Sequence, residues 1–267
     1  VLLVILIATC SCAAEADVTR IPFGIYVQGG ITSPVTKDVY CLDPSACPPF
    51  STGKGMSVDA LLTTSFPLRD ELSILTGIGG GIWTTTMHST DAAGRTRDAR
   101  GNVVDFLREQ SLESRCTYLS AMAACSYSID ALRLSLGPRV EIALASPLWK
   151  QTSSIISPSN VSYEDGSRSR ISVPEQAISA ANPIRLSAVA IAEYAFTVSP
   201  SLQFAPFGTM SYSPMSVRSG ADWTDIRAAI GIAVHSFIEF RNSTPKPEAS
   251  TPVYNETMPP PEPVTAV

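Results

Sequence analysis

The chain has 267 residues, a net charge of −5 at pH 7, 45% hydrophobic residues and only 16% charged residues. The acidic balance does not point to nucleic-acid binding, and the length suits one large β domain or two smaller ones. After the N-terminus, no apolar run approaches the roughly 18 residues that a membrane helix needs. An apolar chain without such runs is typical of a membrane β-barrel, in which each strand is only half apolar.

Residues 1–16 are predicted to be a secretory signal peptide that lacks its start. Residues 1–9, VLLVILIAT, form an apolar core, and Ala14-Glu15-Ala16 supplies a cleavage site with small flanking residues. The alternative is a lipoprotein acylated at Cys10 or Cys12.

Export makes disulfides possible. Cys41 and Cys47 bracket the turn-forming residues LDPSA, and we expect them to close a small loop; two free thiols are the alternative. Cys116 and Cys125 are nine residues apart in one predicted strand. They therefore lie on opposite faces and cannot bond to each other, and Cys125 is expected to face lipid.

The clearest strand is Arg133–Ala145, RLSLGPRVEIALA, in which even positions are apolar and odd positions are small or charged. A period of two indicates an extended strand, and thirteen residues span roughly 43 Å, enough to cross a bilayer. Seven more segments repeat the pattern. The eight predicted strands are 21–32, 56–67, 71–83, 117–129, 133–145, 184–198, 202–212 and one between 223 and 240.

Long segments and short turns alternate between these strands. The long segments are 33–55, 84–116, 146–182 and 213–222, and a short helix is possible at 103–110. Pro206 predicts a bulge in strand 202–212. Val189 and Ile191 break the apolar–polar alternation of strand 184–198. Even strand number with long loops on one side is the pattern of an antiparallel, up-and-down outer-membrane barrel, which must close because no sheet edge can face lipid.

The polar face of the strands is predicted to line the lumen. It is mostly Gly, Ala, Ser and Thr and contains no lysine, whereas a soluble lipocalin-like barrel, the alternative, would need charged residues there for solvation. Four acids and four bases lie on this face, and inside a barrel they can pair. We expect a plug of paired charges, with a gated pore as the alternative, formed by Asp59, Arg133, Arg139, Glu141, Arg185, Glu193, Asp225 and Arg227.

Aromatic residues gather near the predicted strand ends. Two girdles are expected where barrel strands cross the membrane interfaces. The outer girdle is predicted to contain Trp83, Trp149, Tyr212 and Trp223, and the inner one Phe66, Phe196 and Phe237.

A signal peptide, eight alternating strands, long loops opposite short turns and a Pro-rich tail together resemble the N-terminal barrel of OmpA-like outer-membrane proteins. Residues 17–240 correspond to the barrel, and residues 241–267, with seven of the 21 prolines, to a periplasmic linker. In that family the linker leads to a peptidoglycan-binding domain. The resemblance therefore implies contact with the cell wall if the sequence is a fragment of a longer protein with that domain; the alternative is a member of the family that lacks it.

The sequence contains few residues for catalysis. His88, next to Ser89, lies where a strand enters an outer loop, and His235 is expected to point into the lumen; both are more simply explained as ordinary polar residues at strand ends. No metal or cofactor site is recognisable. The sequence predicts a non-catalytic anchor in the outer membrane of a diderm bacterium, in contact with lipid and lipopolysaccharide. A lipid-modifying enzyme and a narrow pore are the alternatives.

Overall fold

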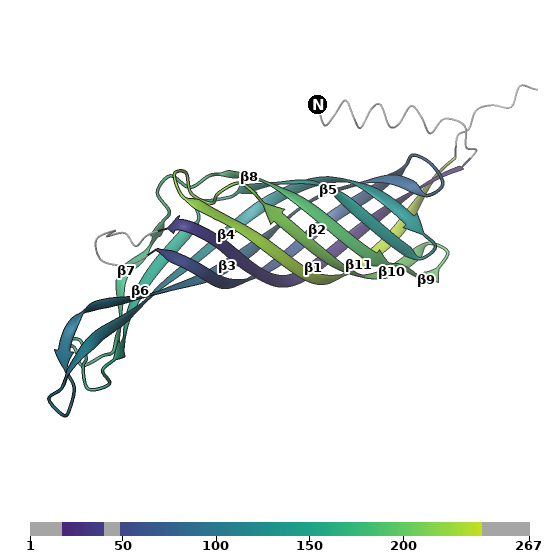
Figure 1. The fold of residues 1–267 in the computed structure, drawn as a ribbon. Helices are drawn as coiled ribbons and strands as arrows, with labels where there is room; N and C mark the ends of the chain where they lie inside the picture. Colours follow the sequence, from purple (N-terminus) through teal and green to yellow (C-terminus); the bar gives the residue numbers. More distant parts are fainter. Residues whose placement is uncertain (1–17, 40–48, 242–267) are drawn as a thin grey trace, which may run out of the picture.

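The computed structural model describes residues 18–39 and 49–241, which form an all-β structure (Figure 1). Within these residues there is no helix that is long and apolar enough to cross a membrane. The predicted signal peptide, the Cys41–Cys47 loop and the Pro-rich linker after residue 241 lie outside the described residues. The strands are β1 (Val18–Val39), β2 (Phe50–Pro67), β3 (Leu72–Arg97), β4 (Val103–Ile129), β5 (Leu132–Ala143), β6 (Leu148–Ser157), β7 (Ser169–Ala177), β8 (Ile184–Tyr194), β9 (Phe196–Ser199), β10 (Leu202–Ser213) and β11 (Asp222–Arg241).

The sheet closes on itself as an antiparallel barrel. Neighbouring strands follow the order β3-β2-β1-β11-β10-β8-β5-β4, and β3 also pairs with β4, which completes the ring. The short strand β9 continues β8 past Ala195 and pairs with β10, so β8 and β9 together make one barrel strand. The described residues therefore form an eight-stranded barrel with the predicted topology. The predicted fold class is confirmed.

The two ends of the barrel differ. Val18 pairs with Arg241, so β1 begins and β11 finishes at the same end, which we call the terminal end. The turns at residues 68–71, 130–131 and 200–201 also lie there. The long connections lie at the opposite, distal end.

The outer surface of the barrel is apolar. On β5, Leu136 is 65% exposed, whereas its neighbours in the alternate positions, Arg139 and Glu141, are only 4% and 5% exposed. The same alternation holds along β1, where Ile25, Val27 and Ile31 are exposed. Large apolar side chains facing outward on a closed barrel form a hydrocarbon-facing belt. The barrel is a transmembrane one, and the soluble alternative is excluded.

The distal end contains more regular structure than the sequence predicts. The segments 84–116 and 146–182 were predicted as loops, yet β3 and β4 run past the barrel as one long hairpin, and β6 and β7 add to the free edge of β4. The short helix that is possible at 103–110 does not form, since these residues begin β4. Figure 1 shows this four-stranded extension, which we call the arm, projecting beyond the barrel.

Two further details correct or explain the strand predictions. The bulge predicted at Pro206 is absent: β10 stays in continuous register with β11 from Leu202 to Ser213. Instead, its pairing with β8 stops at Phe207 and resumes with β9 at Phe204, because proline has no N–H for the ladder. Val189 and Ile191 break the alternation because both point inward, into the lumen.

Candidate functional site: the barrel lumen

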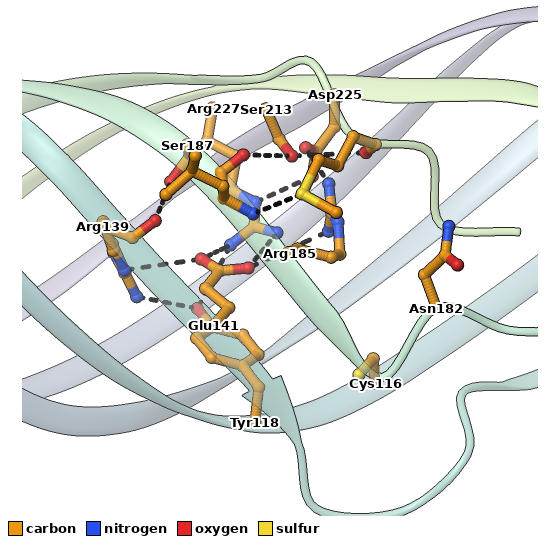
Figure 2. Close-up of polar contacts among 12 residues, drawn as sticks. Cys116, Tyr118, Arg139, Glu141, Asn182, Arg185, Ser187, Ser213, Asp225 and Arg227 are labelled. Carbon is orange, nitrogen blue, oxygen red and sulfur yellow. Dashed lines mark hydrogen bonds and ion pairs between the residues drawn. The ribbon is translucent and has the colours of Figure 1, made fainter.

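The centre of the lumen holds an ion network built around Glu141 and Arg227. Glu141 lies on β5 and Arg227 on β11, across the lumen from it, and two guanidinium nitrogens donate to its two oxygens at 2.8 and 3.0 Å. Arg227 Nε also donates to Asp225 Oδ2 at 2.9 Å. Such a bidentate contact fixes the geometry of both groups. Figure 2 shows these side chains converging from separate strands.

Two more arginines complete the network. Arg185 on β8 donates to Asp225, and its Nη1 lies 3.9 Å from Glu141 Oε2. Arg139 Nη2 donates to Asp59 Oδ1 at 2.7 Å, and its Nε lies 3.4 Å from Glu141 Oε1. The six charged side chains are all less than a tenth exposed. Three acids thus face three arginines, and this balance limits the cost of burying charge.

Tyr118 and Gln28 bind the network without adding charge. The Tyr118 hydroxyl donates to Asp59, and the guanidinium groups of Arg139 and Arg227 lie 5.6 and 5.4 Å from its ring centroid. Gln28 donates to Asp59 Oδ2 at 3.1 Å and accepts from Thr209 at 2.9 Å. Aromatic faces attract cations, so Tyr118 stabilises both arginines from the side.

A second polar group lies nearer the terminal end. Glu193 on β8 accepts from Tyr26, contacts His235 Nε2 at 2.8 Å and lies 3.5 Å from Arg133 Nη1. His235 fits because Gly24 opposite has no side chain: a Cβ there would come within 2.6 Å of His235 Nδ1. The predicted lumen charges are therefore brought together as one group of six and one separate pair.

Apolar clusters close the lumen around these polar groups. The succession is visible along β11, where Trp223 is followed by the Asp225–Arg227 pair, then by Ala233 and His235. The inner cluster, between the two polar groups, consists of Tyr26, Leu61, Leu75, Met122, Ala124, Val189, Ile191, Ala205, Phe207 and Ala233. The outer plug, at the distal end, consists of Val39, Phe50, Trp83, Met87, Leu112, Cys116, Tyr118, Trp149, Ile178, Val217 and Trp223.

Two distal loops cover the outer plug. Residues 178–183 and 216–221, which we call the lid, bond to each other through Asn182 N to Val217 O and Ser219 N to Ala180 O, both 2.9 Å. Beneath the lid, a cavity of about 10 Å³ touches Glu141, Arg185 and Trp83. This volume is about the minimum that holds one water molecule.

The predicted outer aromatic girdle is wrong for its three tryptophans. Trp83, Trp149 and Trp223 are 2%, 2% and 1% exposed and belong to the outer plug. Their positions in the strands have inward parity, and that parity decides their direction. Tyr212 and Phe196 are exposed, Phe66 is half-buried on the outer face, and Phe237 is half-buried at a position of inward parity.

His88 and Ser89, the adjacent pair noted in the sequence, do not meet in the structure. His88 is exposed on the arm while Ser89 is buried on the opposite face of the same strand, as adjacent strand residues must be. The Nδ1 atom of His88 contacts both Ser111 Oγ at 3.2 Å and Glu109 Oε1 at 3.0 Å. A triad needs the serine and the acid on opposite ring nitrogens, and here one nitrogen meets both.

The predictions for Cys116 and Cys125 are confirmed. Cys116 is buried and Cys125 is exposed on the barrel surface, and both are free. Sequence reasoning missed Tyr118, Tyr26 and Gln28 as parts of the polar groups. Each has inward parity in a strand whose face was already assigned, so parity was the signal that could have identified them.

Comparison with solved structures finds other membrane barrels at low similarity. Neisserial surface protein A shares 10% identity, covering 79% of this chain and 96% of its own, with a TM-score of 0.35. The attachment invasion locus protein Ail of Yersinia pestis shares 13% identity over 80% of this chain and 98% of its own, with a TM-score of 0.28. The outer membrane protease OmpT from Escherichia coli shares 9% identity over 84% and 99%, with a TM-score of 0.35.

The fold is an outer-membrane β-barrel. This assignment rests on the closed strand order and the apolar belt of the chain itself. No known protein family matches the sequence, and a comparison with curated proteins finds no match.

Proposed function

We propose that this protein is a structural, non-catalytic anchor in the outer membrane of a diderm bacterium. In this proposal the closed barrel holds the arm and the distal loops outside the cell, and the terminal end faces the periplasm. Long loops outside and short turns inside are the usual orientation of outer-membrane barrels. The observation that carries the proposal is the filled lumen, in which the outer plug, the ion network and the inner cluster follow one another along the axis.

The filled lumen argues against transport. Eight strands leave an interior just wide enough for side chains, and here the side chains contact one another across it, as Glu141 and Arg227 do. The barrel wall closes through β3 and β4 and does not require the contacts of the arm. The large exposed arm therefore argues for a role in display.

The finer, OmpA-like part of the proposal concerns the periplasmic side. The Pro-rich sequence after Arg241 suits an extended tether, and in OmpA-like proteins such a tether leads to the cell wall. Sedimentation of the natural full-length protein with purified peptidoglycan tests this role. Binding supports the tether, and protein that stays in the supernatant contradicts it.

Single-channel recording in a planar bilayer tests the closed lumen. We expect no conductance steps from the folded protein, and steps after the Arg227→Ala change, which removes the bridge across the lumen. Stable channels formed by the unmodified, folded protein would show that the lumen is a pore and overturn the anchor proposal.

Lipid analysis of cells that produce the protein tests the lack of catalysis. We expect outer-membrane lipids to be identical, by mass spectrometry, in cells that produce the unmodified protein and in cells that produce the His88→Ala variant. A lipid species that appears only with the unmodified protein would favour the lipid-modifying alternative.

A further inference from the structure

The ladder between β8 and β10 ends early on the distal side. Its last pair is Tyr212 with Ala188, although β10 stays in register with β11 as far as Ser213. Two positions beyond Tyr212 on β10 the chain reaches Pro214, and the matching position on β8 is Leu186. Proline has no N–H to give to a ladder. The main-chain ladder of this seam therefore stops short of Leu186.

Two side chains replace the missing ladder bonds at Leu186. Its N–H donates to Met215 Sδ at 3.2 Å, and its carbonyl oxygen accepts from Ser213 Oγ at 3.1 Å. Leu186 directly follows Arg185 of the ion network, and Met215 directly precedes lid residues 216–221. The Met215 thioether thus joins the distal end of β8 to the loop that carries one half of the lid.

Met215 differs from the other methionines of the described residues. Met87 and Met122 are buried inside the barrel, and Met56 and Met210 face outward on β2 and β10. Met215 lies in a distal loop and is 38% exposed, so a small solute at the distal rim can reach its sulfur. Among the methionines in residues 18–39 and 49–241, it alone accepts a hydrogen bond at sulfur.

The sulfur of Met215 is also the atom of this contact that a peroxide can modify. Hydrogen peroxide transfers one oxygen atom to a thioether: the O–O bond breaks, an S–O bond forms, the sulfur gives up two electrons and water leaves. An oxygen added between Met215 Sδ and the Leu186 nitrogen does not fit within 3.2 Å, because a hydrogen bond to that oxygen alone needs about 2.7–3.2 Å. An oxygen added elsewhere on the sulfur points away from the N–H. Oxidation therefore breaks the contact in either case.

We propose that Met215 is an oxidation site, at which hydrogen peroxide converts the thioether to a sulfoxide and so releases the distal end of the β8–β10 seam. The change is reversible, because methionine sulfoxide reductases remove the oxygen. Such a site gives the barrel a redox-sensitive point at the edge of the lid, which the anchor role does not require.

Amide hydrogen exchange at Leu186, measured by NMR on the refolded protein in detergent micelles, tests the proposal. We expect hydrogen peroxide to oxidise Met215, as peptide mass spectrometry reports, and to speed the exchange about two- to ten-fold, the effect of losing one hydrogen bond. Both classes of methionine sulfoxide reductase together should restore slow exchange. Met215→Leu keeps a similar volume without the sulfur; its Leu186 amide should exchange as fast as in the oxidised protein and should not respond to peroxide.

Met210→Leu is the matched control. Met210 lies on the same seam, opposite Ala190, and its sulfur accepts no hydrogen bond from the described residues. This variant should show slow exchange at Leu186 and keep the full response to peroxide, and heat-modifiable gel mobility should show that each sample is folded.

Three results would overturn the inference. These are unchanged exchange at Leu186 after complete oxidation of Met215, an equal response to peroxide in Met215→Leu, and a Met215 that stays reduced while the buried Met87 is oxidised. None of them bears on the anchor role, which conductance and sedimentation with peptidoglycan test.

Discussion

Gly81 on β3 lies directly opposite Asp59 on β2, and a Cβ at Gly81 would come within 2.5 Å of the Asp59 carboxylate oxygen and 2.8 Å of the Tyr118 hydroxyl. The lack of a side chain at Gly81 therefore leaves the space that Asp59 and Tyr118 occupy in the ion network. The same relationship holds between Gly231 and Phe207, where a Cβ would come within 2.6 Å of the ring. Inward glycines in this barrel make room for large side chains from neighbouring strands.

The Gly81→Ala change should destabilise the barrel by about 1–3 kcal/mol, the usual cost of overpacking an interior, because Asp59 and Tyr118 must move. Urea unfolding in lipid vesicles, followed by tryptophan fluorescence, measures this loss. Gly29→Ala is the control, since Gly29 faces outward and its added Cβ would have no neighbour closer than 3.9 Å. Equal effects of the two changes would contradict this account of Gly81.

Glu141 and Arg227 should behave as a coupled pair. Removing either partner leaves the other charge buried, and such changes cost about 3–5 kcal/mol. Removing both with Glu141→Gln and Arg227→Gln keeps the lumen neutral, so the double variant should lose at least 1 kcal/mol less than the sum of the single losses. Unfolding in vesicles provides all four free energies, and strictly additive losses would show that the two side chains do not interact.

The Tyr26 hydroxyl should stabilise the buried Glu193 carboxylate. Loss of a hydrogen bond to a charged group costs about 1.5–3 kcal/mol, so Tyr26→Phe should lower the unfolding free energy by that amount. Tyr194→Phe is the comparison, because Tyr194 is exposed on the outer face and should change stability by much less. An unchanged unfolding free energy in Tyr26→Phe would contradict a stabilising hydrogen bond from Tyr26 to the Glu193 carboxylate.

The arm should lose a local contact in acid. Hydrogen bonds from Ser167 hold the pKa of Asp165 below its ordinary value of 3.8. Because the folded pKa is depressed, the contact contributes stability above the ordinary pKa and is lost as the pH falls through the depressed value. Carboxyl-carbon NMR should show Asp165 titrating below 3.8 and closer to 3.8 in Ser167→Ala; a midpoint at or above 3.8 in the unmodified protein contradicts this contact.

The barrel could be predicted from sequence because lipid imposes a simple rule on it. Every outward residue of the belt must be apolar, so alternation marks the strands and their faces, as it does for Leu134 and Leu136 against Ser135 and Arg139. The lumen charges follow from the same parity. Their pairing in three dimensions, such as Glu141 with Arg227, depends on strand stagger, which alternation does not reveal.

The arm was missed because that rule stops at the membrane surface. Beyond Trp83, the outward positions of β3 are Thr84, Thr86, His88 and Thr90, polar residues that face water. Apolar alternation is absent there, although the run of threonines favours strand structure. Trp83 and Trp223 differ from the expected girdle for another reason: both have inward parity, and parity decides the direction of a strand side chain even near a membrane interface.

The central claim, that outward residues touch hydrocarbon while paired charges fill the axis, is tested most directly by a nitroxide scan of β5 in lipid vesicles. Labels placed one at a time on residues 134–142 report their accessibility to oxygen, which dissolves in lipid, and to a water-soluble nickel complex. We expect positions 134, 136, 140 and 142 to be accessible to oxygen alone, and 135, 137, 139 and 141 to be accessible to neither. The account would be contradicted if labels at 134, 136, 140 and 142 were inaccessible to oxygen while labels at 139 and 141 were accessible to the nickel complex.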